Sequence, residues 1–183
     1  RALMYFIEEN PDWPRLHAVR RKVESSIGDS SLTPAEIAAW FDTYPPLGYD
    51  GARAYIDALS RLQQTTRARA ALADFWPGAE LSKNQTSSFA AVYKSLFAKG
   101  AMAARLDHLL WEGRYAEADT MLAFVTPDLR ALGYARLALA KQLPDAASAV
   151  QKVPAALQGN EGLLFERMRY SRRKDTGDSA LEM

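Results

Sequence analysis

Apolar residues recur at helical spacing along almost the whole chain. Leu16, Val19, Val23 and Ile27 are one example among many, and this spacing places the apolar side chains on one face of an α-helix. We find no convincing alternation of apolar and polar residues of the kind that indicates a strand. The pattern therefore predicts an all-α protein.

Capping residues and prolines divide this pattern into short helices. Thr33-Pro34-Ala35-Glu36 predicts a helix start, with Thr as the cap and Glu at the reciprocal capping-box position. Thr126-Pro127-Asp128 predicts a second helix start of the same kind. The prolines fall between periodic segments or in their first turns, at Pro11, Pro14, Pro34, Pro45, Pro46, Pro77, Pro127, Pro144 and Pro154. This punctuation predicts roughly eleven short helices.

Short helices with one apolar face each must bury that face against their sequence neighbours, as antiparallel hairpins. An internal repeat agrees with this: segment 59–72 aligns with segment 109–122. The alignment matches Leu59, Ala68 and Leu72 with Leu109, Ala118 and Leu122.

The turn at Gly113-Arg114-Tyr115 is typical of the turn between the two helices of a tetratricopeptide (TPR) hairpin. A third copy is predicted at 172–180, with Ala180 in the place of Ala118. The copies are unequally spaced and lie further apart than the TPR period of about 34 residues. We therefore expect an α-solenoid, a superhelix of degenerate TPR-like antiparallel hairpins.

The expected superhelix forms a single helical-repeat domain over residues 1–183. The chain begins as if in the middle of a helix at Arg1-Ala2-Leu3 and stops without a cap at Leu181-Glu182-Met183. Both ends are typical of a fragment of a longer chain.

Composition narrows the classes of function. The hydrophobic fraction of 48% and the charged fraction of 25% are those of a globular protein. A net charge of +1 gives no field to attract a phosphate backbone or an anionic membrane, so we expect no nucleic-acid partner. The absence of cysteine excludes disulfides and thiol nucleophiles, and the apolar runs are too short to predict a membrane span.

Six stretches occur together in a fixed order. They are Asn10-Pro11-Asp12-Trp13-Pro14, Arg20-Arg21-Lys22-Val23-Glu24, Tyr44-Pro45-Pro46-Leu47, Arg105-Leu106-Asp107-His108-Leu109-Leu110-Trp111-Glu112-Gly113-Arg114, Val153-Pro154-Ala155-Ala156-Leu157 and Arg169-Tyr170-Ser171-Arg172-Arg173-Lys174. The ordered set resembles the superhelical region of soluble lytic murein transglycosylases, of the alphaproteobacterial kind.

The resemblance implies a periplasmic parent enzyme that cleaves the MurNAc–GlcNAc bond of peptidoglycan and leaves a 1,6-anhydromuramyl end. One glutamate acts as general acid and then base, in a C-terminal lysozyme-like domain that this chain does not include. The implied partners are the glycan strands and that catalytic domain, and no cofactor is implied.

The family's catalytic motif opens with Glu-Ser-x-Phe and continues into Gly-Leu-Met-Gln. Glu24-Ser25-Ser26-Ile27 is the stretch most similar to the first part, but Ile27 stands where the motif has an aromatic residue. The stretch most similar to the second part is Gly162-Leu163-Leu164-Phe165. We interpret Glu24 as a solvated helix residue, and we assign no catalytic residue.

The other chemistry-bearing residues also have simpler interpretations. His17 and His108 lack a second ligand at helical spacing, so no metal site is predicted. The tryptophans, Trp13, Trp40, Trp76 and Trp111, could stack on sugars but are more typical of packing, most clearly Trp40. The basic runs 20–22 and 172–174 could hold stem-peptide carboxylates, yet such runs are usually solvated.

Two functional hypotheses remain. The first is a non-catalytic scaffold that helps position peptidoglycan for a separate catalytic domain. The second is a TPR-like module that binds a peptide or partner protein and has no connection with the cell wall. Under either hypothesis the substrate-binding residues are unknown.

Overall fold

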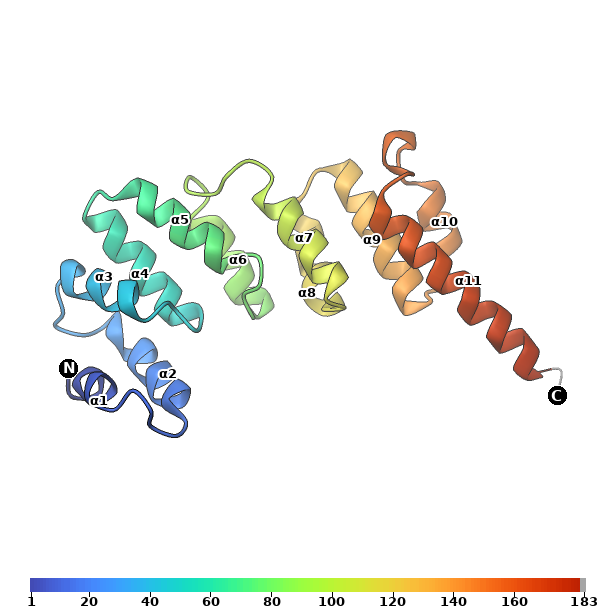
Figure 1. Cartoon of the computed structure of the whole chain (residues 1–183). Coiled ribbons are helices and arrows are strands. Elements are labelled where there is room, and N and C mark those ends of the chain that lie inside the picture. Colours follow the sequence, from blue (N-terminus) through green and yellow to red (C-terminus); the bar gives the residue numbers. More distant parts are fainter. Residues whose placement is uncertain (182–183) are drawn as a thin grey trace. The chain divides into compact units, whose positions relative to one another are not determined.

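The computed structural model describes the backbone of residues 1–181 and the side chains up to residue 173. These residues form eleven α-helices and two short 3-10 helices, and the described backbone contains no strand. The α-helices are α1 (Ala2–Glu9), α2 (Leu16–Ile27), α3 (Pro34–Thr43), α4 (Tyr49–Arg61), α5 (Thr65–Phe75), α6 (Lys83–Val92), α7 (Ala101–Trp111), α8 (Tyr115–Met121), α9 (Pro127–Lys141), α10 (Ala146–Gln151) and α11 (Glu161–Leu181). The all-α prediction is confirmed (Figure 1).

The helices group into two compact units, Arg1–Lys99 and Gly100–Met183. The first unit contains α1 to α6 and the second α7 to α11. The single continuous domain over 1–183 stays a prediction. Within the described part of the chain, no helix combines the length and the apolar character that crossing a membrane requires.

The predicted helix start at Thr33 is confirmed in full. The backbone amide of Glu36 donates to Thr33 Oγ1 (3.2 Å), and the backbone amide of Thr33 donates to Glu36 Oε2 (2.7 Å). Thr126 does precede α9, with Pro127 in the first turn, but its side chain makes no capping hydrogen bond. A second capping box, between Ser82 and Gln85 at the start of α6, was missed.

The two aligned segments form the same helix–turn–helix. α4 and α5 are joined through Gln63 (φ 59°), and α7 and α8 through Gly113 (φ 71°). In each turn the backbone amide of the residue after the left-handed one donates to a carbonyl of the preceding helix. The amide of Gln64 donates to the Leu59 carbonyl and the amide of Arg114 to the Leu109 carbonyl, both at 2.9 Å. The left-handed residue and this backbone bond are those of a Schellman C-cap.

The third copy of this turn lies elsewhere than predicted. It joins α9 to α10 through Gln142 (φ 56°), after which the amide of Leu143 donates to the Ala138 carbonyl at 2.9 Å. At 172–180 α11 continues without a turn through Gly177, so no inter-helix turn occurs there. The packing of Ala180 lies outside the described side chains.

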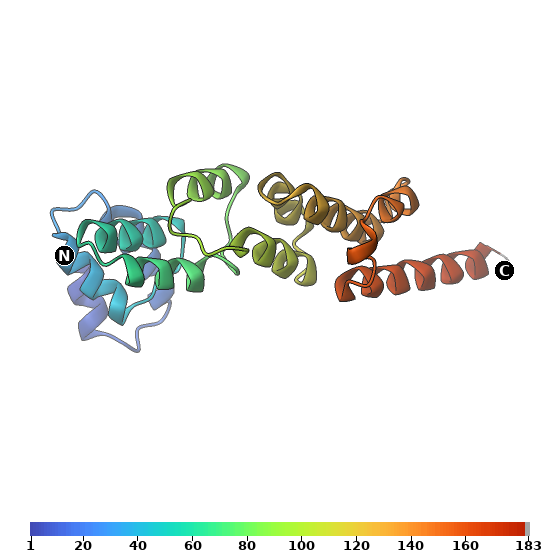
Figure 2. The same ribbon diagram turned by 90° about the horizontal axis from the view of Figure 1, so that it is seen from above.

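Each unit has its own apolar core. In the first unit it forms between α1, α2, α3 and α4, around Ile27, Trp40 and Phe41. In the second it forms around α9, which packs against α10 and α11 through Leu132, Leu139 and Leu163. In Figures 1 and 2, α11 projects beyond the other helices of its unit towards its C-terminal end.

Candidate functional site

Glu24, on α2, is buried, and the prediction that it is a solvated helix residue is wrong. Only 4% of its surface is exposed. Val23 and Ile27 occupy the apolar face of α2, and Glu24 lies at the edge of that face, where α4 covers it. The sequence of α2 alone carries no sign of this, because the covering segment begins 23 residues later.

The Glu24 carboxylate binds the two residues that precede α4. Oε1 accepts a hydrogen bond from the backbone amide of Leu47 (2.8 Å), and Oε2 accepts one from Gly48 (2.9 Å). Gly48 is the N-cap of α4 and has no side chain with which to cap. Glu24 therefore satisfies amides that the helix cannot satisfy itself, at the end where the helix dipole favours a negative charge.

Gly51 makes this contact possible. A Cβ atom at Gly51 would lie 2.6 Å from Glu24 Cδ and 2.8 Å from Cγ, far inside van der Waals contact. The backbone of α4 therefore approaches the glutamate as closely as only glycine allows.

Burial and the neighbouring groups shift the pKa of Glu24 in opposite directions. Burial raises the pKa of the carboxyl group, and this effect is larger than the opposing effects of the Leu47 and Gly48 hydrogen bonds and of the Arg20 and Arg21 charges. A buried carboxyl with a raised pKa is a feature of general acids. Here, however, both oxygens already accept backbone hydrogen bonds, which makes the group a structural anchor.

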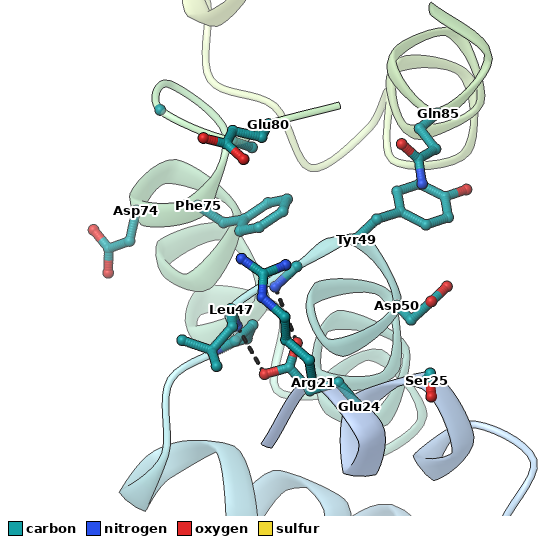
Figure 3. A pocket seen from close by; sticks show the side chains of 14 residues that line it. Arg21, Glu24, Ser25, Leu47, Tyr49, Asp50, Asp74, Phe75, Glu80 and Gln85 are labelled. Carbon is teal, nitrogen blue, oxygen red and sulfur yellow. Dashed lines mark hydrogen bonds between the residues drawn. The ribbon is translucent and has the colours of Figure 1, made fainter. Parts of the chain in front are cut away.

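Glu24 lies at the base of a cavity of about 630 Å³ in the first unit. Its polar and aromatic lining consists of Arg21, Glu24, Ser25, Tyr49, Asp50, Asp74, Phe75, Glu80 and Gln85. In Figure 3 the Arg21 side chain reaches into the middle of the cavity, while Asp50 and Glu80 lie on different sides of it. Four carboxylates and one guanidinium give the cavity a net negative charge, which favours an amine in a ligand, while the Arg21 guanidinium can bind a carboxylate.

The two basic runs are solvated in part, and only Arg20 and Arg173 among their described side chains are half-buried. Arg20 donates to the Pro45 carbonyl (2.6 Å) and lies over the Tyr44 ring, and Arg21 lines the cavity. Arg173 donates to the Ala140 carbonyl of α9 at 2.9 Å. Arg21, Lys22 and Arg172 are exposed as expected, and the side chain of Lys174 lies outside the described residues.

The tryptophans divide into two pairs. Trp40 and Trp76 are buried, which confirms the packing interpretation for them. Trp13 and Trp111 are about half exposed, each against one phenylalanine, Phe6 and Phe165 respectively. The sequence pattern singled out Trp40 and did not distinguish Trp76 from the two exposed tryptophans.

The histidines lie in different units: His17 is exposed on α2, and His108 is half-buried on α7. Among the described residues no group of three or more His, Asp or Glu side chains is arranged to hold a metal ion. Ile27 and Leu163, from the two stretches compared with the catalytic motif, are core residues of different units.

Asp50, Asp74 and Glu80 were missed as site residues. They come from α4, α5 and the segment after α5, and no spacing in the sequence relates them to Arg21 or Glu24. No protein-family model matches the chain, and comparisons with curated proteins and with solved structures give no significant match either.

Proposed function

We propose that the chain is the non-catalytic helical-repeat region of a soluble lytic murein transglycosylase. Its hairpins would stack as a degenerate TPR-like superhelix that positions peptidoglycan in the periplasm for a separate C-terminal lysozyme-like domain. The observation that carries the proposal is the ordered set of six family-like stretches. In this proposal none of the residues of the chain is catalytic.

The contacts between these stretches support their being a matched set. Stretch 20–24 binds stretch 44–47 through Arg20 to the Pro45 carbonyl and through Glu24 to the Leu47 amide. In the second unit, stretches 105–114 and 169–174 both bind α9, where Asp107 pairs with Arg136 and Arg173 donates to Ala140. Residues that resemble the family are thus those that join one helix to another.

The cavity above Glu24 supplies a place where murein could be held. Peptide stems carry carboxylates, which Arg21 can bind, and free amines, which Asp74 and Glu80 can bind. Tyr49 and Phe75 add aromatic surface suited to the apolar parts of a stem or sugar. Binding there would hold the strand in register without touching the scissile bond.

One test concerns the parent protein. The reading frame beyond Met183 is expected to continue through further helices into a domain with Glu-Ser-x-Phe and Gly-Leu-Met-Gln. Purified sacculi should release anhydromuropeptides on incubation with that parent and none with these 183 residues. A stop codon soon after Met183, or turnover by the 183 residues alone, contradicts the proposal.

A second test concerns the cavity. Sacculi co-sedimentation should retain the chain, and retention of the double variant Asp74→Asn/Glu80→Gln should be about fivefold lower. The matched control Glu8→Gln/Asp12→Asn removes the same charge from exposed positions of the same unit. Equal loss in the two variants would show general charge attraction and would contradict a role for the cavity.

The alternative, a TPR-like module that binds a protein partner unrelated to the cell wall, is favoured by one observation. Trp111 and Phe165 form an exposed aromatic pair on the second unit, with ring centroids 5.2 Å apart. An exposed aromatic cluster is typical of a protein-binding surface.

A further inference from the structure

α11 is apolar on two faces. Leu163 is buried against α9, whereas Leu164, Phe165 and Met168 project from the exposed side of the helix. Together with Trp111 at the end of α7, these three are all of the large exposed apolar side chains that the second unit has among its described residues. We call these four residues the α11 patch. A helix with apolar residues on both faces is normally covered on both.

The aromatic part of the α11 patch is held in place. Trp111 and Phe165 contact each other, and a guanidinium lies over each ring: Arg136 over Trp111 at 5.3 Å and Arg169 over Phe165 at 5.4 Å. Arg136 is ion-paired with Asp107, and Arg169 with Glu166 at 3.1 Å. The exposed rings are therefore ordered before any partner arrives, which lowers the entropy cost of binding.

The α11 side of the patch has a cationic rim, whereas Asp107 and Glu112, both exposed, are the acidic neighbours of Trp111 on the α7 side. At 100° per residue, Arg167 lies on one side of the Leu164–Met168 stripe and Arg169 on the other, and Arg172 follows Met168 by one turn. Arg167 and Arg172 are exposed. On the exposed face of α11, among the described side chains, the acidic residue is Glu161 in the first turn. An apolar stripe with this rim complements an apolar stripe flanked by carboxylates.

We propose that the α11 patch binds an acidic amphipathic helix of a partner protein. Leucine-like side chains at positions i, i+3, i+4 and i+7 of that helix would cover Trp111, Phe165 and Met168, and flanking Asp or Glu would meet Arg167 and Arg172. Phe165 is only 37% exposed and Trp111 48%. The two rings are therefore partly packed against the unit and do not protrude as membrane-inserting residues do. The proposal does not depend on the murein assignment.

The test uses two labelled synthetic peptides of about 18 residues, long enough for five helical turns. Both carry the same leucine stripe, and the remaining positions are glutamate in one and lysine in the other. Fluorescence anisotropy should show saturable binding of the acidic peptide, about tenfold tighter than that of the basic one. Met168→Glu should weaken the acidic peptide about tenfold, and Arg167→Glu/Arg172→Glu should reverse the preference between the two peptides.

Val92→Glu is the matched control, because Val92 is an exposed apolar residue of the first unit, on α6. It should leave the affinity for the acidic peptide unchanged. The proposal is overturned by equal binding of the two peptides, by no binding of either, or by equal effects of Val92→Glu and Met168→Glu. Binding of the chain to anionic phosphatidylserine vesicles but not to the peptide, or self-association that Met168→Glu abolishes, would assign the patch to a lipid surface or to a second copy.

Discussion

The contact between Glu24 and Gly51 can be tested by adding a single methyl group. In Gly51→Ala the new Cβ would lie 2.6 Å from Glu24 Cδ, so the carboxylate has to move away from the Leu47 and Gly48 amides. Overpacking costs about 1–3 kcal/mol, and each hydrogen bond of a charged group contributes about 1.5–3 kcal/mol. Replacing glycine by alanine within a helix returns about 0.5–1 kcal/mol.

The expected net destabilisation by Gly51→Ala is therefore about 2–4 kcal/mol. The same substitution in a Glu24→Ala background has no side chain to displace, so there it should be neutral or stabilising. The double-mutant cycle should therefore give a coupling free energy of about 2–5 kcal/mol between the two positions.

Urea unfolding followed by tryptophan fluorescence suits this measurement, because Trp13, Trp40 and Trp76 lie in the first unit. Gly28→Ala is the control: Gly28 ends α2 in a right-handed conformation (φ −65°), and a Cβ there would meet no atom within 4 Å. A Gly51→Ala effect as small as that of Gly28→Ala, or equal in the two backgrounds, would refute the close approach.

Three further predictions follow from the caps, the turns and the buried carboxyl. Thr33→Ala removes the side-chain acceptor of the capping box and should lower the free energy of unfolding by about 1 kcal/mol; a change within error would contradict the cap. Gln142→Gly should raise the melting temperature, because Gln142 has φ 56° and glycine relieves about 1–2 kcal/mol of left-handed strain; a lower melting temperature would contradict this turn geometry. Because the pKa of Glu24 is raised above its usual 4.5 in the folded chain, the stability it contributes is fully present below pH 4.5 and is lost as the pH rises through the raised value. In chemical unfolding at several pH values, wild type should therefore lose stability relative to Glu24→Gln over that window, and a constant difference would contradict the burial.

Local features of the fold could be predicted because their causes lie within a few residues. The Thr33–Glu36 capping box needs only four residues, and the prolines terminate helices through their own rings. The aligned Leu59 and Leu109 segments share a turn because the residues that form it are adjacent in sequence. Gln142 was missed because glycine, not glutamine, is the usual residue at that left-handed position.

The candidate site could not be predicted, because its parts come together only in the folded unit. Glu24 has the pattern of a surface residue until the N-terminus of α4 covers it. Asp74 and Glu80 reach the same cavity from α5 and the segment after it. In the second unit, the sequence of α11 does not show whether the face with Leu163 or the face with Leu164 and Phe165 is buried. Only the packing of Leu163 against α9 decides which of the two faces turns inwards.

The hydrogen bonds from Leu47 and Gly48 to Glu24 have a consequence for hydrogen exchange. These two amide protons precede α4, and their acceptor belongs to α2. Their protection from solvent therefore lasts only while α2 remains docked, even if the rest of α4 stays helical. Their exchange rates give a direct measure of how often the first two helices separate from the remainder of their unit, before the unit unfolds as a whole.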